Sequence, residues 1–183
     1  MNKHFYHPPK PPICNPVVPC FVWDSLVATP TGEVRVQDIV PGMKVITRDN
    51  GIKEVTWAGK ATAHGFYTVK GSNFSPNHRV LYIVDNDEVF IQAKLAPEAV
   101  YRDDPTTFVH FMLDMHEVVM VDGVWSESFF PGPYIMDNME QEAADEIRYL
   151  FPDYSDWEMA RKTLKKAEIP ENLSDAHENV PLA

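Results

Sequence analysis

The chain has 183 residues, 44% of them hydrophobic, a composition that suits one folded domain with an appendage and excludes gross disorder. Its formal net charge of -11 argues against nucleic acid or an anionic membrane as a partner, because both attract cationic surfaces. With only Cys14 and Cys20, a disulfide-rich secreted scaffold is also excluded.

No apolar run approaches the length of a membrane span, and the N-terminus has no apolar segment of signal-peptide type. We therefore expect a soluble protein made in the cytoplasm. The first 19 residues contain six prolines, a density that disfavours helix and sheet and favours an extended, polyproline-like leader.

From Phe21 to about Phe130, short β-rich runs alternate with turn signals. The runs include VRVQDIV, MKVITR, HRVLYIV, EVFIQA, FVHFML and HEVVMV. The pairs Asn50-Gly51 and Asp122-Gly123 suit tight hairpin turns that need positive φ. The sequence therefore predicts an all-β domain over residues 20–132.

After residue 132 the pattern becomes helical. MEQEAADEIRYLF places Ala143, Ile147 and Leu150 on one helix face, and a second helix is expected over SDWEMARKTLKKAE, with Ser155 or Asp156 as its N-cap. Residues 136–183 carry 12 acids and 5 bases, a balance of -7. We divide the chain into a leader (1–19), a β domain (20–132) and a helical extension with a tail (133–183).

Cys20 begins the β domain directly behind the leader, where a nucleophile can attack the peptide bond that precedes it. A cysteine reacts as the thiolate, so it needs a nearby base. His78 suits the general acid that protonates the departing Cys20 nitrogen, and Ser75 can hold the scissile amide or stabilise the oxyanion.

Three blocks of the chain resemble the Hint domain, the fold shared by Hedgehog autoprocessing domains and inteins, and most closely its bacterial stand-alone type. They are CF...ATPTGEVRVQDIVPGMKVITRDNG, FSPNHRVL and FVHFMLDMHEVVMVDGVWSESF. The resemblance implies a horseshoe of short strands with a C-terminal helical extension. It places Ser75 and His78 at the Thr and His of the family's Thr-x-x-His block and His116 at the histidine of the closing block.

The resemblance implies autoprocessing: an N-to-S acyl shift at Pro19-Cys20, followed by cleavage of the thioester. The domain's substrate would be its own leader, with no cofactor, and His116 would assist thiol activation or thioester resolution. The closing block reads Trp125-Ser126-Glu127-Ser128 without the splicing Asn, so splicing and ligation are not expected. No carboxylate follows the early hairpin where sterol-transferring domains carry an Asp.

Several alternatives stay open. Pro19 crowds the attacked carbonyl and disfavours rapid cleavage, while its ring also permits a cis Val18-Pro19 bond. A non-catalytic Hint module is the competing class. In the leader, His4 and His7 with Cys14 and Cys20 would form a soft-ligand set for zinc, and Cys14 and Cys20 could pair in a masking disulfide. We interpret His110, within the apolar run FVHFM, as a packing residue.

Overall fold

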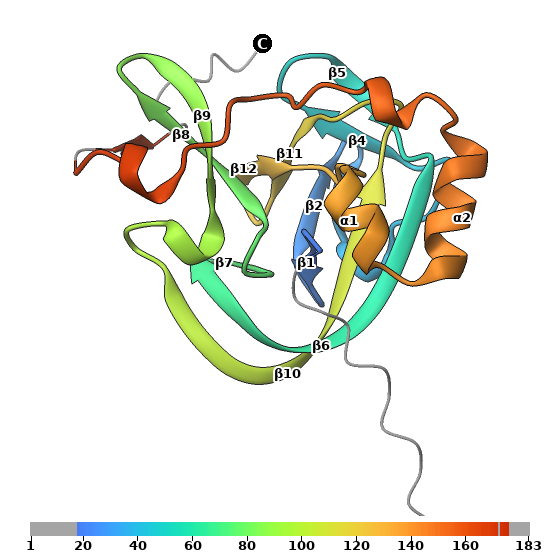
Figure 1. Ribbon diagram of the computed structural model, residues 1–183, viewed down its shortest axis with the longest axis horizontal. Helices are drawn as coiled ribbons and strands as arrows, with labels where there is room; N and C mark the ends of the chain where they lie inside the picture. Colours follow the sequence, from blue (N-terminus) through green and yellow to red (C-terminus); the bar gives the residue numbers. More distant parts are fainter. Residues whose placement is uncertain (1–17, 172, 176–183) are drawn as a thin grey trace, which may run out of the picture.

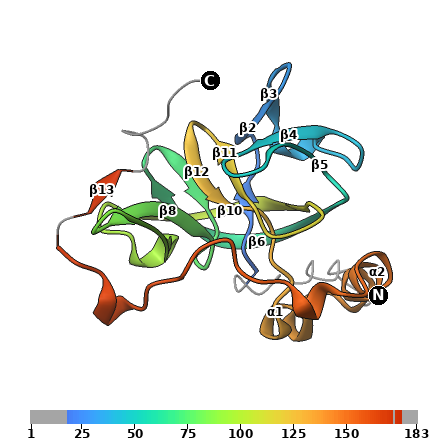
Figure 2. The same ribbon diagram turned by 90° about the horizontal axis from the view of Figure 1, so that it is seen from above.

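The computed structural model describes residues 18–171 and 173–175, and its architecture is all-β with a short helical extension (Figures 1 and 2). The strands are β1 (Phe21–Val22), β2 (Leu26–Thr29), β3 (Gly32–Arg35), β4 (Lys44–Thr47), β5 (Gly51–Glu54), β6 (Trp57–Val69), β7 (Ser72–Phe74), β8 (Arg79–Val84), β9 (Asp87–Gln92), β10 (Val100–Met112), β11 (Val118–Val121), β12 (Val124–Glu127) and β13 (Ser174–Asp175). The prediction of an all-β Hint-type fold is confirmed.

Two long strands, β6 and β10, form the base of the molecule, where they run side by side in a broad curve (Figure 1). They pair antiparallel from Trp57↔Met112 to Thr68↔Val100, and the register shifts between Arg102 and Pro105. Pro105 has no backbone N–H to donate to a hydrogen bond between the strands, so it is best accommodated where the pairing is irregular. With β1 and β7 these strands close a small barrel, ordered β1-β10-β6-β7.

The other nine strands form a second sheet. Its main path is β13-β8-β12-β11-β2-β3, while β4 pairs with β11 and β5, and β9 pairs with β8. The predicted Asp122-Gly123 turn joins β11 to β12, with φ of 51° and 73° at the two residues. The hairpin between β4 and β5 has a longer loop than predicted, because Thr47 pairs with Gly51; of the predicted Asn50-Gly51 pair only Gly51 has positive φ, at 67°.

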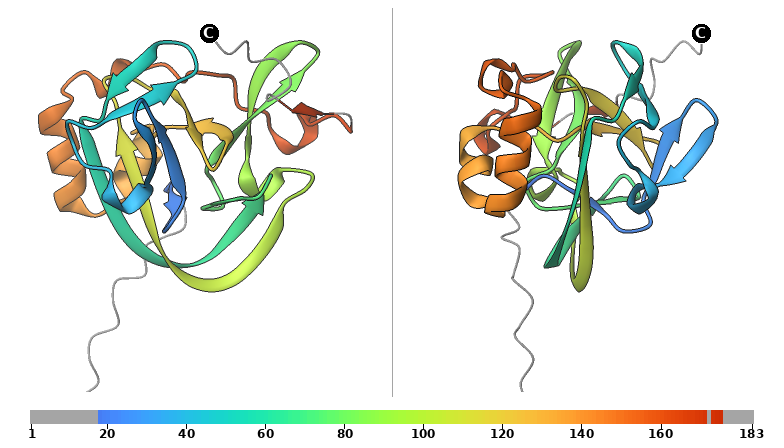
Figure 3. Two further views of the ribbon diagram at one scale, coloured as in Figure 1. Left: turned by 180° about the vertical axis from the view of Figure 1, so that it is seen from behind. Right: turned by 90° about the vertical axis from the view of Figure 1, so that its right-hand side faces the viewer.

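Two helices cover one side of the barrel, α1 (Pro133–Asn138) and α2 (Gln141–Leu150), and Figure 3 shows them stacked against its flank. The predicted helix over MEQEAADEIRYLF corresponds to α2. Its buried residues are Ala144 and Ile147. Of the other two residues predicted on the apolar face, Ala143 is half-buried and Leu150 is 45% exposed. None of the described helices is long and apolar enough to cross a membrane.

The second predicted helix, over residues 155–168, is wrong. Only short 3-10 turns form, at Tyr154–Asp156 and Lys166–Glu168, and the stretch between them is extended. Its backbone joins the sheet instead: the Phe90 amide donates to the Lys162 carbonyl at 2.8 Å, and the Leu164 amide donates to the Phe90 carbonyl at 2.9 Å. Pairing with the edge of β9 outweighs a weak helical preference.

A separate apolar cluster lies between the barrel and the two helices. Its buried members include Val18 and Cys20 from the start of the described chain, and Met136, Ala144 and Ile147 from the helices. The helical extension therefore covers the region in which the predicted nucleophile lies.

Candidate functional site

Cys20 lies just before β1, and its side chain is only 2% exposed. Val18 and Pro19 are buried as well, so both sides of the predicted scissile bond lie inside the domain. All peptide bonds of the described residues are trans, so Val18-Pro19 does not adopt the cis form that the sequence left open.

Ser75 makes three hydrogen bonds to the backbone around the scissile bond. Pairing of Phe21 with Phe74 brings the end of β7 beside Cys20. The Ser75 hydroxyl accepts from the Cys20 amide at 2.8 Å and donates to the Val18 carbonyl at 2.9 Å, while the Ser75 amide donates to the Cys20 carbonyl at 3.0 Å. These three hydrogen bonds hold the backbone on both sides of the Pro19-Cys20 bond.

His110, which the sequence analysis interpreted as a packing residue, lies beside the Cys20 thiol. It follows Val109, which pairs with Phe21 across β10 and β1, and its Nδ1 atom lies 3.1 Å from the Cys20 Sγ atom. The imidazole packs against Trp57 and Phe129, each with ring centroids 5.1 Å from it, and these two rings also pack on each other, with centroids 5.9 Å apart. This packing fixes the ring against the thiol.

Burial sets the protonation state of this pair. Desolvation lowers the pKa of His110 to about 4, so the imidazole is neutral at pH 7. A neutral imidazole with its proton on Nε2 offers a lone pair on Nδ1 to the thiol. The Cys20 Sγ atom also lies 3.3 Å from the Val18 carbonyl oxygen. The arrangement can take the thiol proton and form a thiolate beside the Pro19 carbonyl.

His78 lies in an apolar setting next to this site. Its ring packs on Phe21 and Phe74, with centroids 4.5 Å and 4.8 Å away. Within the described part of the chain, neither ring nitrogen has a hydrogen-bond partner. Desolvation lowers its pKa to about 4; the Glu127 carboxylate opposes this shift and Arg79 adds to it. His78 is therefore a buried neutral imidazole one turn from Ser75.

His116 has partners of a different kind. Its Nδ1 atom accepts from the Ala160 amide at 3.0 Å, and its Nε2 atom lies 3.2 Å from a Glu127 oxygen. Glu127 also accepts from the amide and guanidinium of Arg79, each at 2.8 Å. Although burial raises the pKa of the Glu127 carboxyl, Arg79 and His116 together hold it at about 2. These contacts anchor the segment after the helices to the sheet and do not join His116 to Cys20.

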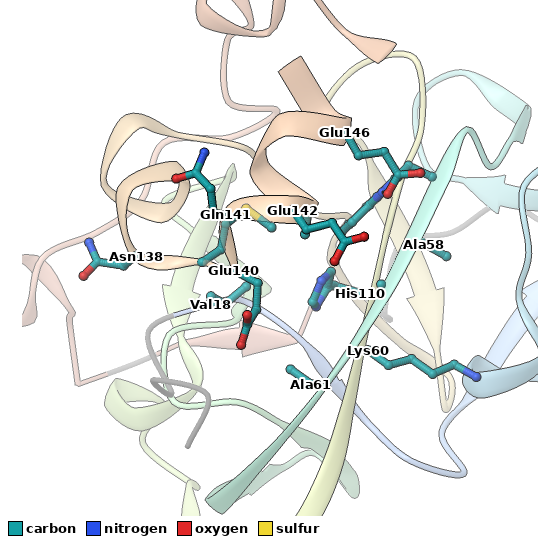
Figure 4. Close-up of a pocket in the computed structure, with 14 residues that line it drawn as sticks. Val18, Ala58, Lys60, Ala61, His110, Asn138, Glu140, Gln141, Glu142 and Glu146 are labelled. Carbon is teal, nitrogen blue, oxygen red and sulfur yellow. The ribbon is translucent and has the colours of Figure 1, made fainter. Parts of the chain in front are cut away.

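A cavity of about 610 Å³ opens beside the Cys20–His110 pair, between β6 and the helices (Figure 4). Val18 and His110 form its inner end, and residues from Asn138 to Glu146 form its opposite wall. Among the side chains that the structure describes, no group of three or more His, Cys, Asp or Glu is arranged to bind a metal. His4, His7 and Cys14 lie outside the described residues. The zinc and disulfide hypotheses, which involve these residues, therefore stay predictions.

Solved structures with a similar fold are intein-like. They include the AceL NrdHF class 3 split intein (16% identity, TM-score 0.49, covering 60% of this chain and 97% of that one). Others are a bacterial intein-like domain from Clostridium thermocellum (19%, 0.49, 60% and 97%) and a DnaB intein from Synechocystis sp. PCC 6803 (10%, 0.46, 60% and 98%). No curated protein matches the chain.

The sequence also matches a protein-family model. The model described as the Hint domain matches residues 19–73 and 72–133, which is more than half of the chain and includes Cys20, Ser75, His78, His110 and His116. This chain therefore belongs to the Hint domain family.

Proposed function

We propose that this Hint domain cleaves its own chain at Pro19-Cys20 through an N-to-S acyl shift, without splicing. The proposal rests on two contacts that Cys20 makes at the same time. Its Sγ atom lies 3.1 Å from His110 Nδ1, and its backbone amide donates a hydrogen bond to Ser75 Oγ at 2.8 Å. Nucleophile, base and scissile nitrogen are thereby assembled before reaction.

In the first step, the Cys20 thiol gives its proton to His110 Nδ1 as sulfur attacks the Pro19 carbonyl carbon. A C–S bond forms and the carbonyl oxygen becomes an oxyanion. The C–N bond to Cys20 then breaks, and the departing nitrogen takes up one proton to become the free amine. The oxyanion collapses to a thioester between Pro19 and Sγ, which water or another nucleophile resolves.

Ser75 and His78 are assigned to the departing nitrogen. The Ser75 hydroxyl already contacts this nitrogen, and a rotation of its O–H bond would turn it into a donor. His78 has both ring nitrogens unpartnered among the described residues, and it is neutral at pH 7. It is assigned to relay a proton: one ring nitrogen takes up a proton from solvent as the other gives its proton to the departing nitrogen. His116 is assigned to anchoring the segment that contains Ala160, in place of the assisting role expected from the sequence.

Intact mass under denaturing conditions tests the proposal. Incubation with hydroxylamine should release residues 1–19 as a hydroxamate, and incubation with dithiothreitol should release them as a thioester or its hydrolysis product. Cys20→Ala should abolish the release, whereas Cys14→Ala, which alters the other cysteine, should leave it unchanged. An unchanged mass of the wild type under all these conditions would instead identify a non-catalytic Hint module.

A further inference from the structure

The cavity beside His110 has a lining suited to a reactant. Its volume of about 610 Å³ is that of a small-molecule site. Val18 and His110 both line it, and each contacts the Cys20 Sγ atom, through the Val18 carbonyl oxygen at 3.3 Å and through Nδ1 at 3.1 Å. A molecule in the cavity would therefore lie next to the residues that hold the thioester sulfur.

The opposite wall is acidic. Glu140, Glu142 and Glu146 line the cavity, and Figure 4 shows their side chains along the helical wall that faces His110. Glu146 accepts a hydrogen bond from the Trp57 indole at 2.8 Å. Within residues 18–171 and 173–175, no ion pair neutralises Glu140 or Glu142.

Lys60, the cationic residue that lines the cavity, makes its contacts outside the acidic wall. The Lys60 ammonium donates to the Gln37 carbonyl at 2.9 Å and lies 5.4 Å from the centre of the Trp23 ring. Figure 4 shows its side chain extending away from the carboxylates. The cavity consequently has a negative potential, which attracts ammonium groups and repels anionic thiols.

His110 supplies an independent sign that a ligand binds here. The residue is 6% exposed, and it lines the cavity. Its Nδ1 atom faces the thiol, whereas its Nε2 atom has no hydrogen-bond partner in the described part of the chain. An unpartnered nitrogen on a largely buried side chain that lines a cavity is suited to contact a bound molecule.

We propose, resting on the function above, that this cavity is the acceptor site of the thioester and that it selects a small aliphatic diamine or polyamine. One ammonium group of the acceptor binds the carboxylates of Glu140 and Glu142. Once Nδ1 holds the proton of the thiol, His110 Nε2 releases its own proton to solvent and becomes an acceptor. A second amine, as the free base, then attacks the Pro19 carbonyl carbon of the thioester and gives a proton to His110 Nε2. The C–S bond breaks, and His110 Nδ1 returns a proton to Sγ.

The atoms balance without any further reactant. The chain and one alkylammonium ion yield an amide between Pro19 and the amine, and the nitrogen of Cys20 becomes an ammonium group. The two ring nitrogens of His110 face the two sites of proton transfer, so one imidazole serves both the formation and the resolution of the thioester.

The test uses 1,5-diaminopentane as the acceptor and hydroxylamine as a nucleophile that needs no ammonium site. Wild type should convert residues 1–19 to the diaminopentane amide with a rate that saturates. The double variant Glu140→Gln, Glu142→Gln should form this amide roughly fivefold more slowly at low diamine concentration, because two exposed ion pairs are lost. Its cleavage by hydroxylamine should match that of the wild type.

The matched control is Glu33→Gln, Glu54→Gln, which changes the net charge equally at two exposed positions outside the cavity. Equal diamine rates in the two double variants, with normal hydroxylamine cleavage, would overturn the acceptor site and leave the proposed function intact. Absence of hydroxylamine cleavage in wild type would overturn both.

A binding measurement is independent of cleavage. In the Cys20→Ala variant, titration followed by NMR should show 1,5-diaminopentane shifting the amide signals of residues 138–146, and pentanedioate, an anion with the same five-carbon chain, should leave them in place. Stronger binding of pentanedioate would overturn the inference.

Discussion

Gly59 leaves the space that the imidazole of His110 occupies. A Cβ atom built at Gly59 would lie 2.6 Å from His110 Nε2, and equally close to the Trp57 ring. Trp57, His110 and Phe129 pack on one another in a three-ring cluster, so neither His110 nor Trp57 can move aside without disturbing its other ring contact. Glycine at position 59 therefore provides the room that this cluster needs.

Gly59→Ala should therefore displace His110 from Cys20. We expect cleavage to slow by at least about tenfold and the free energy of unfolding to fall by about 2 kcal/mol, the usual scale of overpacking. Cleavage kinetics and urea denaturation measure the two effects. Gly132→Ala is the matched control, because its Cβ would meet nothing closer than 3.3 Å; equal behaviour of the two variants would refute this account of Gly59.

His110→Gln should slow cleavage by about 100-fold at pH 7, the usual scale for a lost general base. The pH dependence separates catalysis from packing. In wild type His110 is neutral above its pKa of about 4, so the base is available across neutral pH. In the variant the thiol must ionise unaided, so the rate should rise tenfold per pH unit towards about pH 8.5.

His64→Gln serves as the control for that experiment, because His64 is exposed and pairs with Asp103 at 3.0 Å. It should keep the wild-type rate and pH profile. A flat profile in His110→Gln would show that His110 does not activate the thiol.

The strands and hairpins were predictable from the sequence because their signals are local. Asp122-Gly123 specifies positive φ wherever it occurs, and alternation around it identifies the flanking strands. The extended stretch over residues 157–165 was not predictable, because it depends on hydrogen bonds to Phe90, far away in sequence. Helical propensity at Arg161 competes there with ion pairs to Asp49 and Glu88 on the sheet.

The site shows the same division. Cys20, Ser75 and His78 could be selected from motifs, but His110 sits at the end of β10 where every residue from Phe108 to Met112 is buried. A histidine in such a run has the same sequence signal whether it packs or reacts. The pairing of β1 with β10 brings His110 to Cys20, and no local pattern of residues predicts that pairing.

Stability should depend on pH through the two buried histidines. The pKa values of His78 and His110 are each about 4 in the folded protein and about 6.5 when unfolded, so the unfolded chain binds more protons between these values. Stability is therefore unaffected above about pH 6.5 and is lost as the pH falls towards 4, by about 3 kcal/mol for each histidine.

His78→Leu removes one of these titrations. In a Cys20→Ala background, which lacks the proposed nucleophile, urea denaturation at pH 7 and pH 4.5 should show a smaller loss of stability in His78→Leu than in its parent. Glu127 does not contribute to the loss of stability between pH 7 and pH 4.5. Its pKa is about 2 in the folded protein and about 4.5 when unfolded, so its protonation affects stability only below about pH 4.5. Identical losses in the two proteins would exclude His78 as the source.

His116→Phe should cleave at nearly the wild-type rate. The Ala160 amide would lose its acceptor, so hydrogen exchange should accelerate at this amide and at its neighbours. If cleavage instead slowed about 100-fold while these amides stayed protected, His116 would belong to the catalytic group.

The burial of Val18 and Pro19 has a consequence for the proposed cleavage at Pro19-Cys20. Val18 is 3% exposed, it belongs to the apolar cluster beneath the helices, and its carbonyl is held by Ser75. None of these contacts depends on the peptide bond to Cys20. Cleavage of the peptide bond and release of residues 1–19 are therefore separate events. After cleavage, the released segment can stay bound to the domain until the contacts around Val18 open.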